Sequence, residues 1–178
     1  MPEIFKNSVT RRVGDVTSNT AASIAANSTS ITALTSTAGV QVGDLIDNQH
    51  FLNGTKVTVV NANDVTVDTA SLNTASVTNQ AVSLLGGQTV FAAIKKSILI
   101  GGTFTNNTRN QVQLSVELYD NSSGVSVQLV GRIPIPSGSS FVLAESGKTV
   151  LEEDDGIRIY CNTADAIDVS LAILEGVN

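Results

Sequence analysis

The feature that most constrains this chain is a strict alternation of polar and apolar residues over positions 111–119. Every second residue from Val112 to Leu118 is apolar, which is the period of a β-strand with one buried face. Residues 125–129 repeat this period after a turn-forming segment at 120–124. No 11-residue window carries the apolar stripe of an amphipathic helix. The pattern therefore predicts strands.

Similar short apolar stretches recur along the chain, separated by Gly, Asn, Asp or Ser. Residues 55–60 and 64–68 follow an Asn53-Gly54 dipeptide and flank a short polar connection, which predicts a hairpin. Pro134 and Pro136 lack the backbone donor that a central strand needs, so they predict an edge strand or a connector. A strand spacing of about 8–12 residues favours an antiparallel sandwich or jelly roll.

The 178 residues also differ in texture along the chain. Residues 17–87 are rich in Thr, Ser, Asn and Ala and carry few charges, whereas residues 88–178 hold the strongest apolar runs. We therefore predict an all-β chain with two parts. Residues 1–16 and 88–178 form an antiparallel, jelly-roll-like β-sandwich domain, and residues 17–87 form an inserted small β-barrel or β-sandwich module.

The charge balance narrows the range of partners. Sixteen acidic and ten basic residues give a net charge of −6, and the sequence pI is near 4.6. A nucleic-acid partner requires a basic surface instead. No apolar run reaches the ~20 residues of a membrane helix, and residues 1–6 lack the features of a secretion signal. We expect neither nucleic acid nor membrane as a partner.

Catalytic and ligating side chains are scarce. One cysteine, Cys161, permits no intrachain disulfide and no thiolate zinc site, and one histidine, His50, permits no multi-histidine metal site. Nothing in the sequence has the spacing of a nucleophile with its base. We therefore expect a protein that is not an enzyme and that needs no cofactor.

The densest cluster of charge is an acidic run in the last third of the chain, formed by Glu152, Glu153, Asp154 and Asp155. Carboxylate oxygens are the ligands that Ca²⁺ prefers. The run lacks the alternating spacing that brings several carboxylates onto one ion, so it is a weak metal candidate. The alternative that we favour is a solvated turn or a rim of salt bridges.

Basic pairs and an apolar N-terminal segment are the candidate contacts with a partner. Neighbouring residues of a strand face opposite sides, so one member of each basic pair shares a face with apolar residues. Arginine is enriched at interfaces, although two solvated strand faces are the simpler interpretation. The candidate interface residues are Ile4, Phe5, Lys6, Arg11, Arg12, Lys95 and Lys96.

Several short segments resemble a family of small β-sandwich structural proteins in the virions of tailed bacteriophages, especially marine ones. They are Phe5-Lys6-Asn7, residues 94–100, the turn at 105–108, the step at 136–141, the acidic turn at 151–157 and the closing strand at 169–175. The resemblance covers residues 1–16 and roughly 88–178. This chain departs from the family in its Asp-Asp-Gly acidic turn, and residues 17–87 stand where the family has a short connection.

The resemblance implies a virion component, assembled in the host cytoplasm, and does not indicate which part of the virion. A two-module β protein without catalytic residues suits a role that depends on contact area, so we expect a capsid-surface decoration or cement protein that stabilises the head by protein–protein contacts. Its partners would be other copies of the chain, with a trimer favoured, and the major capsid protein or other virion proteins. One alternative is a neck or tail ring or fibre-attachment subunit. A second is a receptor- or glycan-binding surface module that uses residues 17–87 as its binding head.

Overall fold

The structure, a computed structural model, describes residues 3–177, apart from the side chains of residues 145–147. These residues form fourteen strands and contain no helix. Every pair of named strands is antiparallel. The predicted all-β, antiparallel fold class is therefore confirmed. A membrane-spanning helix is not found among the residues that the structure describes.

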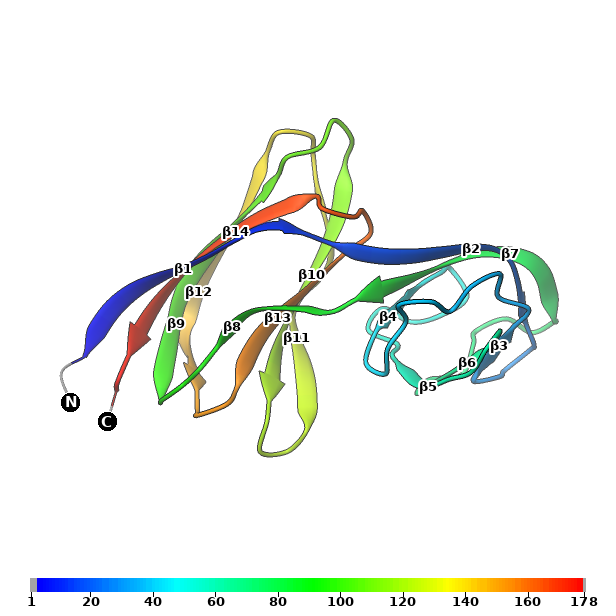
Figure 1. Ribbon diagram of the computed structural model, residues 1–178, viewed down its shortest axis with the longest axis horizontal. Helices are drawn as coiled ribbons and strands as arrows, with labels where there is room; N and C mark the ends of the chain where they lie inside the picture. The colour runs from blue at the N-terminus through cyan, green and yellow to red at the C-terminus, as the bar shows by residue number, and fades with distance from the viewer. Residues whose placement is uncertain (1–2, 178) are drawn as a thin grey trace. The chain divides into compact units, whose positions relative to one another are not determined.

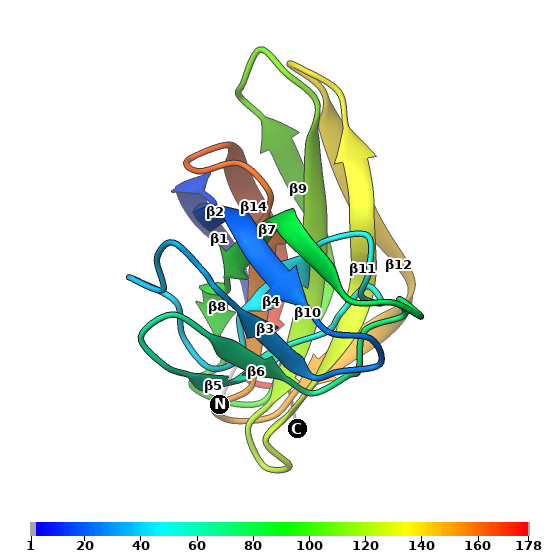
Figure 2. The ribbon, with the colours of Figure 1, turned by 90° about the vertical axis from the view of Figure 1, so that its right-hand side faces the viewer.

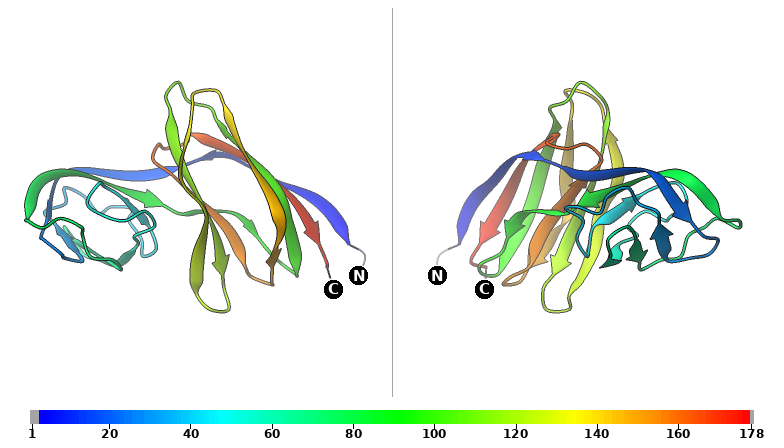
Figure 3. Two further views of the ribbon diagram at one scale, coloured as in Figure 1. Left: turned by 180° about the vertical axis from the view of Figure 1, so that it is seen from behind. Right: turned by 45° about the vertical axis from the view of Figure 1, so that its right-hand side comes forward.

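Eight strands form a two-sheet sandwich (Figures 1 and 3). The strands are β1 (Ile4–Val13), β8 (Gln88–Ala92), β9 (Ser97–Asn106), β10 (Val112–Asp120), β11 (Val125–Ile135), β12 (Ser140–Leu151), β13 (Gly156–Cys161) and β14 (Ile167–Glu175). One sheet has the order β1-β14-β9-β12 and the other the order β11-β10-β13-β8. Renumbered from one to eight along the chain, these orders are 1-8-3-6 and 5-4-7-2, the double Greek key of a jelly roll.

The core of the sandwich is the space between its two sheets. The alternation that we predicted for residues 111–119 is confirmed, because Val112, Leu114 and Val116 are fully buried in this core. They pack with inward residues of the other sheet such as Leu99 and Phe104. Pro134 lies in β11, which is an edge strand as predicted.

The remaining six strands form a third sheet (Figure 2). They are β2 (Asp15–Ile24), β3 (Ser30–Thr32), β4 (Leu45–Asp47), β5 (Val57–Val60), β6 (Val65–Val67) and β7 (Val77–Gly86), in the order β4-β7-β2-β3-β6-β5. Backbone bonds from Gly43 N to Val57 O (2.8 Å) and from Ile46 N to Thr55 O (3.0 Å) join the two ends of this order. The sheet therefore closes into a small barrel around a core of Ile, Val, Leu and Phe side chains. The predicted hairpin is confirmed as β5 and β6.

The chain divides into two compact units at Gly14/Asp15 and Gly87/Gln88, and the sequence-based boundary after residue 16 lies two residues further on. Gly14 has a φ of +139°, and a Cβ atom there would overlap the carbonyl oxygen of Thr163. Only glycine fits this exit from the sandwich. The strand β2 was not predicted, because its residues are mostly Thr, Ser, Asn and Ala and show little alternation.

Candidate interaction surface

The outward side of the β1-β14-β9-β12 sheet carries a straight row of large apolar side chains. The register places Phe5 opposite Leu174, Leu174 opposite Ile98, and Ile98 opposite Val150. Phe5 is 78% exposed and Val150 is 45% exposed, while the two central residues are half-buried. We call these four residues the ridge row.

A row of small residues lies next to the ridge row. It consists of Asn7, Ala172, Gly101 and Ala144, which are again paired across the four strands. The two rows are two residues apart on β1 and β14, whereas the exposed Ile100 lies between them on β9 and residues 145–149 lie between them on β12. These residues line a hollow of about 310 Å³. We call them the groove row, because their short side chains leave the sheet surface lower than the ridge beside it.

A third row completes this surface and contains Val9, Ser170, Thr103 and Val142. We call the three rows together the open face. None of the twelve residues is charged. The solvent side of an antiparallel sheet is ordinarily polar, and large exposed apolar patches mark contact sites in soluble proteins. The open face therefore has the chemistry of a protein contact.

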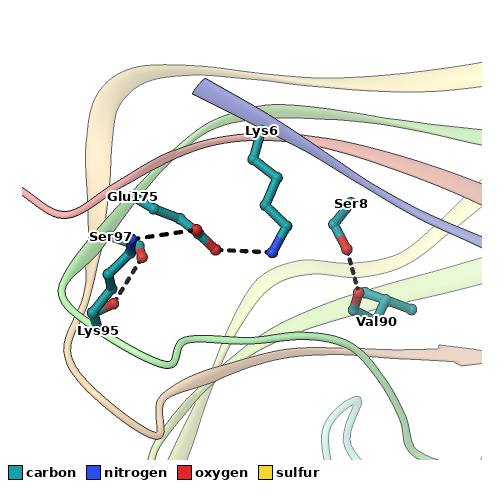
Figure 4. Close-up of polar contacts among 6 residues, drawn as sticks. All are labelled: Lys6, Ser8, Val90, Lys95, Ser97 and Glu175. Atoms are coloured by element: carbon teal, nitrogen blue, oxygen red, sulfur yellow. Dashed lines mark hydrogen bonds and ion pairs between the residues drawn. The ribbon is translucent and has the colours of Figure 1, made fainter. Parts of the chain in front are cut away.

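The N-terminal end of β1 is held by a carboxylate between two ammonium groups (Figure 4). Glu175 on β14 has a side chain only 7% exposed, and its Oε1 atom accepts a hydrogen bond from Lys6 Nζ at 3.1 Å. Lys95 Nζ lies 3.8 Å from the other carboxylate oxygen. Two predicted interface residues, Lys6 and Lys95, thus converge on one internal acid.

Two further hydrogen bonds surround this cluster. Ser8 Oγ on β1 donates to the carbonyl oxygen of Val90 at 3.1 Å, which links the two sheets at one side of the sandwich. Ser97 Oγ donates to the carbonyl oxygen of Lys95 at 2.8 Å and fixes the turn that carries this lysine. The cluster therefore fixes the edge strand β1, on which Ile4 is half-exposed at 50% and Phe5 projects into the ridge row.

Arg11 and Arg12 lie at the other end of β1 and share one acid. Arg11 Nε is 3.4 Å from Asp168 Oδ2, and the backbone N–H of Arg12 donates to Asp168 Oδ1 at 3.0 Å. Arg12 has a φ of 55° within a break in the β1–β14 register. The hydrogen bond from Arg12 N, followed in effect by those from Asn107 and Arg11, holds the pKa of Asp168 below its usual value.

The acidic turn before β13 is organised by hydrogen bonds within the chain. Asp155 is buried, and its carboxylate accepts from Glu152 N at 2.8 Å and from Asn121 N at 3.0 Å. Glu152 pairs with Lys96 at 3.2 Å. Glu153 and Asp154 are exposed, and Asp154 has a φ of 70°. Among the residues that the structure describes, no three His, Cys, Asp or Glu side chains are grouped as a metal site would require.

The outward side of the β11-β10-β13-β8 sheet is polar by contrast. Tyr160 Oη donates to Glu117 Oε2 at 3.1 Å, and both residues are buried. The guanidinium of Arg158 lies 3.8 Å from the ring centre of Tyr119. A hollow of about 430 Å³, lined by Tyr119, Asn121 and Arg158 among others, opens beside this pair.

Most of the open face was not predicted from the sequence. The predicted interface residues include Ile4, Phe5 and basic residues, but not Ile98, Val142, Val150 or Leu174. The available signal was the continuous apolar character of residues 98–100, 141–144 and 171–174, where alternation is lost. Such runs are typical of strands with both faces covered.

Comparison with known proteins adds little. No family model matches this chain, and no curated protein matches it. A solved structure, hydroquinone 1,2-dioxygenase from Sphingomonas sp. TTNP3 with 4-hydroxybenzoate bound, is similar over 53% of this chain and 60% of its own, at 15% identity and a TM-score of 0.16. A likeness at this level carries no argument about fold or activity.

Proposed function

We propose that this chain is a non-enzymatic structural protein of a tailed-phage virion, located on the capsid surface as a decoration or cement protein. The observation that carries the proposal is the open face, an uncharged apolar surface on the outside of a jelly-roll sandwich. Jelly rolls are a recurrent architecture of viral capsid proteins. The sequence resemblance over the sandwich residues points to the same class.

A decoration protein works by contact area, and the open face is suited to this task. Burial of apolar surface contributes about 25 cal/mol per Å² before the unfavourable entropy of association is subtracted. The ion pairs of Lys6, Lys95 and Arg11 with acids of the same chain keep β1 in place. The strand that carries Phe5 and Val9 is therefore held ready for contact.

The proposal is tested by counting copies in purified particles with quantitative mass spectrometry, relative to the major capsid protein. Hundreds of copies per particle are expected for a decoration protein. About six to twelve copies would move the protein to the neck or tail, as symmetry there is low-order. Absence from washed particles would overturn the virion proposal.

A second candidate, a glycan-binding module, is favoured by the polar hollow beside Tyr119. This hollow combines an aromatic ring, the Arg158 guanidinium and the Asn121 amide, groups that can hydrogen-bond to sugar hydroxyls. Binding of the intact chain on a glycan array, lost in Tyr119→Ala, would support this function. Binding that is instead lost on deletion of residues 17–87 would assign it to the inserted barrel.

A further inference from the structure

We infer that the polar hollow beside Tyr119 binds an acidic sugar, with the carboxylate of the sugar held by the guanidinium of Arg158. The inference rests on the second candidate function above and names the class of glycan that this site takes. Three features of the hollow carry it: the position of Arg158, the polar groups around this side chain and the hydrogen bonds that fix the walls.

Arg158 lies beside a break in the sheet register and next to the ring of Tyr119. On β13 it is placed between Glu117 of β10 and Thr89 of β8, and the pairing with β8 shifts its register at this point. Such a bulge changes the direction of a side chain. The guanidinium carbon lies 3.8 Å from the centre of the Tyr119 ring. A Cβ atom at Gly156, opposite Tyr119, would lie 3.6 Å from Thr89 Cγ2, so glycine keeps the hollow open.

The Arg158 guanidinium is available to a ligand. Among the residues that the structure describes, none forms a hydrogen bond or ion pair with it, and its contact is with the Tyr119 ring. A guanidinium has five N–H donors, and its planar fork matches the two oxygens of a carboxylate. Because the guanidinium covers one face of the Tyr119 ring, that face cannot stack on a neutral sugar. Recognition therefore depends on charge, which favours an acidic sugar.

The other groups of the hollow suit the hydroxyl groups of a sugar. The Asn121 amide and the Thr89 hydroxyl can each donate and accept, whereas the Asp154 carboxylate only accepts. Asp154 repels a carboxylate and can accept from hydroxyls, so the two charged groups orient the ligand with its acid toward Arg158. The hollow, at about 430 Å³, has the size of a small-molecule site.

The loops that form the walls are fixed by a buried acid. The Asp155 carboxylate accepts from Asn121 N at 3.0 Å and from Glu152 N at 2.8 Å. Asp154 N donates to the carbonyl oxygen of Ala93 at 2.7 Å, which ties the acidic turn to the end of β8. Walls held in this way lose little conformational freedom on binding. The acidic turn thus supports the hollow.

The test is titration of the intact, isotopically labelled chain with single sugar acids, followed by NMR. The probes are glucuronate, galacturonate and N-acetylneuraminate, each compared with its methyl ester, which keeps the hydroxyls and lacks the charge. At least one acid should shift the amide signals of residues 119–121 and 154–158. It should bind about tenfold more tightly than its ester, the effect of one charge-assisted hydrogen bond. The chain has a net charge of −6, so general attraction of anions cannot produce this preference.

Variants of Arg158 assign the preference to this side chain. Arg158→Gln removes the charge and should bring the acid and its ester to equal affinity. Arg158→Lys keeps the charge without the fork and should retain part of the difference. The matched control is Arg109→Gln, which makes the same change at an exposed position between β9 and β10, outside the hollow. It should bind the acids as wild type does.

Three results would overturn the inference. If acid and ester bind wild type equally, the hollow binds sugars without selecting the acid. If acetate binds as tightly as the sugar acids, the hollow is an anion site and does not recognise the sugar. If none of the sugar acids binds, the inference fails, while the glycan array still tests whether the chain binds any glycan. None of these results alters the copy number in particles, which tests the virion proposal.

Discussion

The sandwich and the inserted barrel use polar residues in different ways. In the barrel, buried amides and hydroxyls fasten the loops: Asn19 Oδ1 accepts from Thr35 Oγ1 at 2.8 Å, and Ser71 Oγ donates to the carbonyl oxygen of Ala25 at 2.9 Å. In the sandwich, large apolar side chains such as Phe104 and Leu99 fill the interior. The Ser, Thr and Asn of the barrel thus add hydrogen bonds to a smaller apolar core in holding its short strands together.

The two units also differ in what they expose. The exposed large apolar residues of the barrel do not form a row: Val59 lies on β5, whereas Val42, Leu52 and Leu72 lie in loops. Most of those of the sandwich lie on the β1-β14-β9-β12 sheet, where they form rows, although Val125 and Val127 are exposed on β11 of the other sheet. The difference indicates that the open face belongs to the working surface of the sandwich, since isolated exposed apolar residues are normal and a continuous face is not.

The largest expected loss of stability follows from a substitution in the sandwich core. Phe104 is fully buried and stacks on Phe141 with ring centres 6.2 Å apart. Phe104→Ala should lower the free energy of unfolding by about 3–5 kcal/mol, because it leaves a cavity. Val65→Ala in the barrel removes only two methyl groups and should cost about half as much. Urea denaturation measures both, and equal losses would show that the barrel depends on its core as strongly as the sandwich does.

The next largest loss of stability is expected when a buried, hydrogen-bonded asparagine is removed from either unit. Asn106 is fully buried, and its Nδ2 donates to the carbonyl oxygens of Asn110 and Ile135 at 2.8 and 2.9 Å. Asn106→Ala leaves buried carbonyls unpaired and should destabilise by about 2–3 kcal/mol. Asn19→Ala should act similarly in the barrel. If Asn19→Ala has no effect on urea denaturation, buried polar side chains do not stabilise the barrel in the way described above.

A smaller effect is expected at the cluster that fixes β1. Glu175→Gln keeps the shape of the side chain but removes the charge that faces Lys6 and Lys95. We expect a loss of about 1–2 kcal/mol, because the acid is buried while both lysines reach solvent. Glu153→Gln, an exposed acid, is the control and should be neutral in the same denaturation experiment. Equal behaviour of the two variants would contradict the anchoring role of Glu175.

The smallest effect concerns pH, and it has opposite signs in the two units. Burial raises the pKa of Asp44 in the barrel, outweighing its hydrogen bonds from Gln41 and Gly87. Its ionisation therefore opposes folding, and stability falls as pH rises from the unfolded value, near 3.8. The pKa of Asp168 in the sandwich is lowered, chiefly by the hydrogen bond from Arg12 N, so its contribution is complete above pH 3.8 and is lost as pH falls.

The variants Asp44→Asn and Asp168→Asn separate these two contributions. The stability difference between wild type and each variant, measured by urea denaturation between about pH 3 and pH 6, should change by less than about 1 kcal/mol. As pH rises, the free energy of unfolding of wild type should fall relative to that of Asp44→Asn. Over the same range it should rise relative to that of Asp168→Asn. Parallel slopes would contradict the assignment of these pKa shifts.

The sequence predicted much of the fold because period-two alternation survives where one face of a strand packs in the apolar core and the other face carries polar side chains. This holds for residues 111–119, whose polar face includes the buried Ser115 and Glu117, and for the β5–β6 hairpin. The same pattern did not predict β2, because its side chains are small and mostly polar and because it pairs with β7, which is distant in the sequence. The jelly-roll strand order likewise depends on long-range pairing that no local pattern encodes.

The candidate surface was predicted only at its margin. Phe5 was identified, but Leu174, Ile98 and Val150 lie in strands far apart along the chain and form a row only through the sheet register. The basic residues were predicted to contact a partner because of their charge. The structure shows that Lys6, Arg11, Lys95 and Lys96 each pair with an acid of the same chain. Their partners could not be identified from sequence spacing.

The central claim, that the open face is a protein contact, is tested most directly by an electron cryomicroscopy map of the assembled protein or particle. We predict that the ridge row, from Phe5 to Val150, is covered by another protein chain. A map in which this sheet faces solvent, while other surfaces of the sandwich make the contacts, would contradict the account.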